Sequence, residues 1–130
     1  MRSYANAVEL AGRILVAGLF VIAGLGKIGA AYAGTQGYMQ AQGLPGALLP
    51  LVIALEVGGA LLVIAGLWTR FAALALAAFT LAAALVFHAN FADPMQQVMF
   101  MKNVAIAGGF LFLVAHGAGT WSIDARRSRG

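Results

Sequence analysis

The chain has 130 residues, of which 62% are hydrophobic and only 9% are charged. A soluble domain carries roughly 25% charged residues, and a disordered chain needs low hydrophobicity and high charge, so the composition excludes both classes and predicts a membrane protein. The net charge of +4 comes from scattered basic residues, which do not predict a nucleic-acid-binding face, and the absence of cysteine excludes disulfides, zinc–thiolate sites and iron–sulfur clusters.

The first half of the chain holds two candidate membrane spans, each close to the 20 or so apolar residues that a transmembrane helix needs. The first is expected over about 10–29 and the second over about 47–67. Charged residues interrupt the first apolar run, which disfavours a cleaved signal peptide. Between the spans, residues 35–42 could form a short interfacial helix capped by Thr35 and ended by Gly43, or an irregular polar loop.

The second half holds two more candidate spans. A tight link over 68–70 leads into the third, which is expected over about 71–90. Asp93 and Pro94 are typical of a helix N-cap and first helical position, and the fourth span is expected over about 97–116. The four spans predict one all-α domain over residues 1–130, an integral membrane four-helix bundle packed through small residues.

The distribution of basic residues predicts the orientation of this bundle. Four spans place both termini on one side of the lipid bilayer, and six of the eight basic residues fall on that side. The positive-inside rule therefore predicts cytoplasmic termini. Arg13 is expected at the cytoplasmic boundary, paired with Glu9 one helical turn away. The six are Arg2, Arg13, Arg70, Arg126, Arg127 and Arg129, and the other two are Lys27 and Lys102.

Four titratable side chains remain that the membrane should exclude. The uncharged parts of the first and fourth helices each span only about 20 Å, against a hydrocarbon core of about 30 Å. Charged groups must therefore enter the membrane region, and depth brings Lys27, Glu56, His88 and Lys102 together in the outer half of the bundle. An unpaired charge in lipid costs at least about 2.5–3.5 kcal/mol, so Glu56 is expected to pair with Lys27 or Lys102.

This cluster has both a structural and a functional interpretation. The lysines could snorkel to the interface, Glu56 could form a purely structural ion pair, and His88 could be an interfacial residue. The functional interpretation makes Lys27, Lys102 and Asn103 the residues that bind a substrate, and Glu56 and His88 a proton relay. A quinone or phenolic head group fits this donor set, and a lipid head group fits nearly as well. Haem is disfavoured because the two histidines are expected near opposite membrane faces, and no metal site is expected.

Several motifs occur in the same order along this chain as in a known family. Because of these motifs, the chain resembles the DoxX family of bacterial inner-membrane proteins, in its YqjF-like branch. The resemblance implies a four-helix inner-membrane bundle and a link to quinone-linked oxidoreductases and oxidative stress, but it brings no firm set of catalytic residues. The motifs include Lys27-Ile28, Gly43-Leu44-Pro45-Gly46, Phe87-His88-Ala89-Asn90-Phe91 and, as the most specific, Met99-Phe100-Met101-Lys102-Asn103.

Three functional hypotheses follow. The first is a membrane protein that binds a quinone or phenolic compound and supports its redox chemistry, as an oxidoreductase or a subunit of one. The second is a non-enzymatic anchor or assembly subunit for a redox partner protein. The third is a small transporter that works as a dimer, a homo-oligomer of this chain, although lysines compete for its intramembrane carboxylate, Glu56. The sequence leaves the substrate and the electron donor open.

Overall fold

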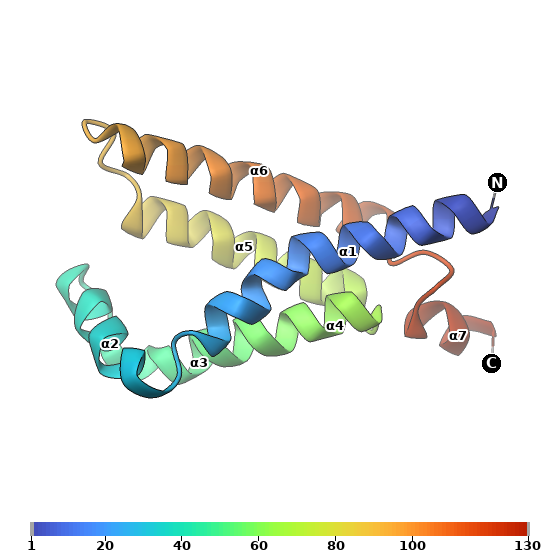
Figure 1. Ribbon diagram of the computed structural model, residues 1–130, viewed down its shortest axis with the longest axis horizontal. Coiled ribbons are helices and arrows are strands. Elements are labelled where there is room, and N and C mark those ends of the chain that lie inside the picture. The colour runs from blue at the N-terminus through green and yellow to red at the C-terminus, as the bar shows by residue number, and fades with distance from the viewer. Residues whose placement is uncertain (1, 130) are drawn as a thin grey trace.

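The computed structural model describes residues 2–129, which form helices joined by turns (Figure 1). Four helical segments are long and apolar enough to cross a membrane, Ser3–Leu25, Gly46–Ala65, Thr69–Phe87 and Pro94–His116. The predicted all-α fold with four spans is therefore confirmed. The ends differ from expectation, since α1 (Arg2–Leu25) begins well before residue 10 and ends before residue 29.

The second span is built from four consecutive helical pieces. A 3-10 turn, η2 (Gly46–Leu48), leads into α3 (Leu49–Ile53), and the span ends with α4 (Ala60–Ala65). Between α3 and α4 lies a π-helical stretch, η3 (Ala54–Gly59), which contains the buried Glu56. Single π turns inside helices are frequent at functional sites, and nothing in the sequence predicted this one.

The helix ends follow local sequence signals where such signals exist. The Asp93 carboxylate accepts a hydrogen bond of 3.0 Å from the backbone N–H of Met95, as expected of the residue that caps α6 (Pro94–His116). Gly66, with φ of 74°, ends α4. Trp68 then adopts a left-handed conformation with φ of 50° directly before α5 (Thr69–Phe87). This compact link is what sets α4 and α5 side by side in opposite directions.

The four spans form two helical hairpins. α1 packs against α4 and η3, and α5 packs against α6. The hairpins meet near the α4–α5 link and separate toward the other end, where α2 lies (Figure 1). Their shared core contains Leu76 and an edge-to-face pair of Phe20 and Phe110, whose ring centroids are 5.4 Å apart.

The segment between the first two spans is a helix, so the helical alternative for residues 35–42 is confirmed. A 3-10 turn, η1 (Gly29–Ala31), leads into α2 (Tyr32–Ala41). The expected cap is wrong, because the helix begins before Thr35 and the Thr35 hydroxyl donates to the Ala31 carbonyl at 2.8 Å. Gly43, with φ of 86°, lies in the turn that follows.

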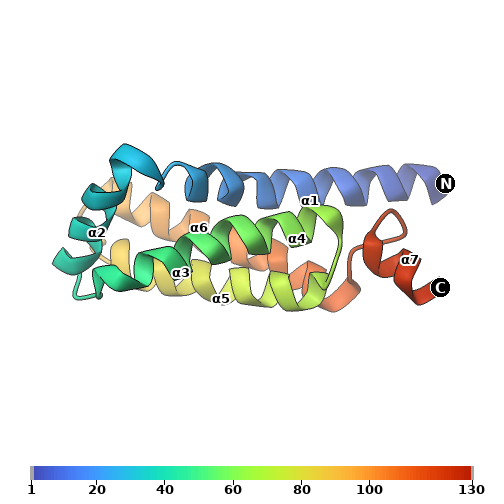
Figure 2. The ribbon, with the colours of Figure 1, turned by 90° about the horizontal axis from the view of Figure 1, so that it is seen from below.

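The N-terminal end of α1 and the final helix, α7 (Ile123–Arg129), lie at the same end of the molecule (Figures 1 and 2). α7 was not expected from the sequence. The predicted Glu9–Arg13 ion pair is wrong, since the ion pair found among residues 2–129 joins Lys27 to Glu56. Arg13 is instead buried and donates to the backbone carbonyls of Val63 and Trp121, which ties α1 to the end of α4 and to the segment before α7.

Candidate ligand-binding cavity

A cavity of about 500 Å³ lies where the two hairpins separate. Its walls come from α1, α2, the second span, α5 and α6, and its volume falls within the range of about 300–1,000 Å³ that is usual for small-molecule sites. All five residues singled out in the sequence line it, namely Lys27, Glu56, His88, Lys102 and Asn103.

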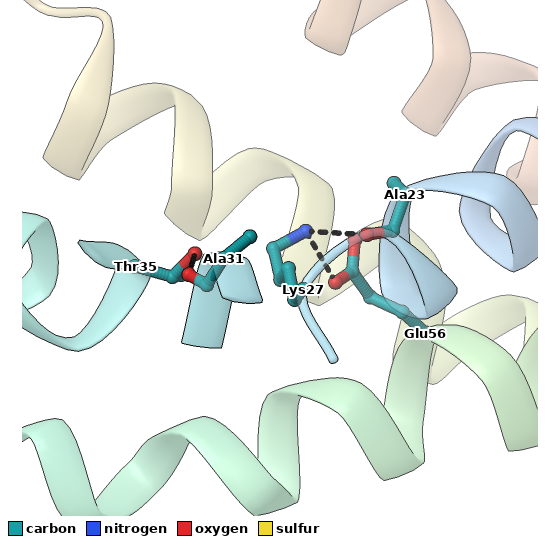
Figure 3. A network of polar contacts seen from close by, with 5 residues as sticks. All are labelled: Ala23, Lys27, Ala31, Thr35 and Glu56. Atoms are coloured by element: carbon teal, nitrogen blue, oxygen red, sulfur yellow. Dashed lines mark hydrogen bonds and ion pairs between the residues drawn. The ribbon is translucent and has the colours of Figure 1, made fainter. Parts of the chain in front are cut away.

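One wall carries an ion pair between Lys27, just past the end of α1, and Glu56 in η3 (Figure 3). The Lys27 Nζ donates to Glu56 Oε1 at 2.7 Å and to the carbonyl oxygen of Ala23 at 3.3 Å. The Glu56 side chain is 5% exposed and that of Lys27 is 27% exposed. Of the two lysines proposed from the sequence, Glu56 therefore pairs with Lys27.

The opposite wall carries a histidine and an amide. His88 follows α5 directly, and its Nδ1 lies 3.1 Å from Oε1 of Gln96 in the first turn of α6. The Asn103 amide Nδ2 donates to the Thr80 carbonyl at 3.4 Å, which is a long hydrogen bond. Gln96 escaped the sequence analysis because its contact with His88 depends on how α5 and α6 pack.

Lys102 differs from Lys27 because its ammonium has no hydrogen-bond or ion-pair partner among residues 2–129. The side chain is exposed, and it borders both the cavity and a second hollow formed with Gln97, Val98 and Met101 on α6. Since Lys27 and Glu56 neutralise each other, Lys102 leaves the cavity with an uncompensated positive charge. Around Lys102 the site therefore favours a ligand atom that accepts hydrogen bonds or carries negative charge.

The end of the cavity that lies away from the two termini is covered by α2 (Figure 1). Tyr38 and Met39 from α2 contribute to the lining, and the Tyr38 ring stacks on Phe87 at the end of α5 with centroids 5.2 Å apart. Gln36 Nε2 donates to the Gly46 carbonyl at 3.1 Å, which holds α2 against the start of the second span. The sequence analysis considered an interfacial helix or a polar loop for this segment and predicted no contact with the cavity.

The remaining walls are apolar and suit a hydrocarbon or aromatic group more than a hydrated ion. No cluster of three or more histidine, cysteine or carboxylate side chains close enough to hold a metal ion occurs within residues 2–129. The apolar lining residues include Leu19, Phe20, Val52, Phe79, Val86 and Ile106.

Comparison with known proteins places this architecture in a family. The model of the DoxX family matches residues 8–89, which include Lys27, Glu56 and His88. The chain belongs to the DoxX family. It is 55% identical over 115 residues to the inner membrane protein YqjF of Escherichia coli (strain K12), covering 88% of each chain.

A second relative is the inner membrane protein YphA of Escherichia coli (strain K12). It is 36% identical over 124 residues, which cover 90% of this chain and 88% of YphA. No solved structure matches the chain. Together with the four spans, these relatives establish a multi-pass protein of the bacterial inner membrane, in contact with the lipid bilayer.

Proposed function

We propose that this DoxX-family protein binds a quinone or a phenolic compound in the outer half of its bundle and supports the redox chemistry of that compound. The observation that carries the proposal is the cavity itself, which combines apolar walls with Lys27, Glu56, His88, Lys102 and Asn103 from different helices. An aromatic ring would pack against the apolar walls, while its oxygen atoms would bond to the polar side chains.

The contacts of the polar residues suggest separate roles. Lys102 and Asn103 would hold an oxygen of the ligand, since the Lys102 ammonium has no other partner among the described residues. Lys27 has three N–H donors, and two of them already bond to Glu56 and Ala23, so one is left for a ligand. Glu56 and His88 would take up or release the proton that accompanies oxidation or reduction of the ring.

The family supports the redox part of the proposal, because the resemblance to DoxX proteins implies a link to quinone-linked oxidoreductases. Electrons would pass between the bound compound and a second quinone or a redox partner protein. A redox partner protein is also what the anchor hypothesis requires, since in that hypothesis this bundle holds the partner at the membrane.

Two substitutions test the site in the purified protein in lipid nanodiscs, with a short-chain ubiquinone or menaquinone analogue as the probe. Lys102→Ala and Glu56→Gln should each weaken binding about tenfold or more, because hydrogen bonds to charged groups contribute about 1.5–3 kcal/mol. Arg126→Ala is the control, since this exposed residue lies on α7 at the far end of the molecule. Thermal unfolding of each variant separates a loss of binding from a loss of folding.

Unchanged affinity in both variants would remove these residues from the site. Mass spectrometry of small molecules retained by the wild-type protein gives an independent result. A retained quinone would support the proposal, whereas a retained phospholipid and no binding of either analogue would make the cavity a lipid site.

A further inference from the structure

We infer that the cavity prefers the reduced, hydroxyl-bearing form of its aromatic ligand to the oxidised, carbonyl form, and that Gln96 sets this preference through His88. The inference rests on the proposed function and names the chemical form of the ligand. Gln96 does not line the cavity, so it is a positioning residue.

The contact between Gln96 and His88 indicates which ring nitrogen carries the proton. Gln96 presents its Oε1 to His88 Nδ1 at 3.1 Å, and an amide oxygen only accepts hydrogen bonds. For a neutral imidazole, this contact is a hydrogen bond only when Nδ1 carries the hydrogen, and in that tautomer Nε2 is the acceptor. His88 lines the cavity, and with Nδ1 bonded to Gln96 the ring nitrogen left for a ligand is Nε2, which in this tautomer accepts a hydrogen bond and does not donate one.

Donors lie on the same side of the cavity. Lys102 and Asn103 are neighbours on α6 and line the cavity with His88. A phenolic hydroxyl would donate to His88 Nε2 and accept from Lys102 or Asn103, whereas a quinone carbonyl can only accept. The oxidised ligand would leave the histidine acceptor without a partner, and sites built to bond a hydroxyl discriminate strongly against analogues that lack it.

The wall with the ion pair offers a similar combination. The Glu56 carboxylate accepts hydrogen bonds, and the Lys27 ammonium beside it donates them. A ring with two hydroxyl groups would therefore find an acceptor next to a donor on each wall, which favours a hydroquinone over a ligand that carries carbonyls alone.

The first experiment compares three ligands of similar size on the wild-type protein in nanodiscs under anaerobic conditions. They are a short-chain ubiquinol, the matching ubiquinone, and the ubiquinol with both ring hydroxyls methylated. The ubiquinol should bind about tenfold or more tightly than the other two, because only the ubiquinol can donate to His88. Equal affinities, or a preference for the quinone, would overturn the inference while leaving the proposed function standing.

Variants of Gln96 test the positioning role. Gln96→Leu removes the acceptor at Nδ1, frees the choice of tautomer and should bring the ratio of quinol to quinone affinity close to one. Gln97→Leu is the matched control, since it changes the next, exposed side chain of α6, which does not line the cavity.

The ratio of the two affinities separates the possible outcomes. A purely structural role of Gln96 would lower both affinities together in Gln96→Leu and leave their ratio unchanged, which would overturn the assignment of Gln96. If neither ligand binds the wild-type protein, the proposed function fails, and the inference fails with it.

Discussion

Gly24 is the position at which α1 comes closest to the π-helical stretch that carries Glu56. A Cβ atom at Gly24 would lie 2.6 Å from Val57 Cγ2 and 3.2 Å from Glu56 Cβ. The missing side chain therefore lets the two backbones approach, and Lys27, one helical turn further on, reaches Glu56. From the sequence, this glycine was one of several small residues with a role in helix packing.

We predict that Gly24→Ala destabilises the protein by about 1–3 kcal/mol, because the added methyl group overpacks the contact with η3. Thermal unfolding in detergent measures this change. Gly18→Ala is the control on the same helix, where a Cβ would meet nothing within 4 Å, and it should leave stability unchanged or raise it by about 0.5–1 kcal/mol. Equal melting temperatures for the two variants would contradict the close approach at Gly24.

The sequence predicted the members of the cluster better than its contacts. Helix length and bilayer thickness fix the depth of a residue, and depth was enough to group Lys27, Glu56, His88 and Lys102. The choice of Lys27 as the partner of Glu56 depends on the rotation of the helices and on the π turn, which have no local sequence signal. The predicted Glu9–Arg13 pair is also wrong because of tertiary packing: Arg13 donates to the backbone carbonyls of Val63 and Trp121, which are distant in the sequence.

Among the elements, α7 contributes the cap of a different helix. The Asp124 carboxylate accepts hydrogen bonds from the backbone N–H groups of Trp68 at 2.8 Å and Thr69 at 2.9 Å, at the start of α5. Its own N–H donates to the Gly66 carbonyl at 2.7 Å. Partial burial alone would raise the pKa of Asp124, but the hydrogen bonds from Thr69 and Trp68 and the charge of Arg127 outweigh it, so the pKa lies below its ordinary value.

We predict that Asp124→Ala lowers the stability of the protein at neutral pH by about 0.5–2 kcal/mol, the usual cost of losing a helix cap. The folded-state pKa is depressed, so this stabilisation is present above the unfolded-state pKa and is lost as the pH falls through the folded-state value. Melting temperatures of wild type and variant, measured from neutral to acidic pH, should therefore converge in acid.

The control for this cap is Arg126→Ala, an exposed substitution on the same helix that leaves the carboxylate in place. It should unfold like the wild type across the pH range. A deficit in Asp124→Ala that stays constant down to acidic pH would show that the ionised carboxylate is not what stabilises α5.

The cap from Asp124 also shows which features of the helices could not be predicted from the sequence. Asp93 was recognised because it caps the helix that follows it directly, a relation visible in a few consecutive residues. Asp124 caps a helix that begins more than fifty positions earlier in the chain, and the π turn in the second span differs from an α turn only in its hydrogen bonds. Neither leaves a local pattern.

At the scale of the whole molecule, composition and span length were sufficient to predict the four-span bundle. They did not predict that the two hairpins separate toward α2, because apolar side chains face a neighbouring helix and the lipid equally well. The side of the membrane that holds the termini was predicted from the basic residues and still awaits a direct test.

The chain contains no cysteine, so any cysteine that is introduced is the only labelling site in the orientation test. Single cysteines at Ser3 and Ser128 mark the terminal end, and single cysteines at Gln42 and Ala92 mark the opposite end; all four positions are exposed. In intact bacterial cells a membrane-impermeant maleimide should label Gln42→Cys and Ala92→Cys, and should label Ser3→Cys and Ser128→Cys only after the inner membrane is permeabilised. The reverse pattern would place the termini outside.

At the end that holds the termini, the two hairpins are joined by the α4–α5 link, by the hydrogen bond from Arg13 to Trp121 and by the cap from Asp124, whereas at the other end it is α2 that contacts both hairpins, through Gly46 and Phe87. Each hairpin extends about 30 Å from the end that holds the termini, the length of a 20-residue helix. A change of about 5° in the angle between the hairpins moves their free ends by about 2–3 Å, while the joined end hardly moves. We therefore expect the width of the cavity to depend on α2, which contacts both hairpins at their free ends.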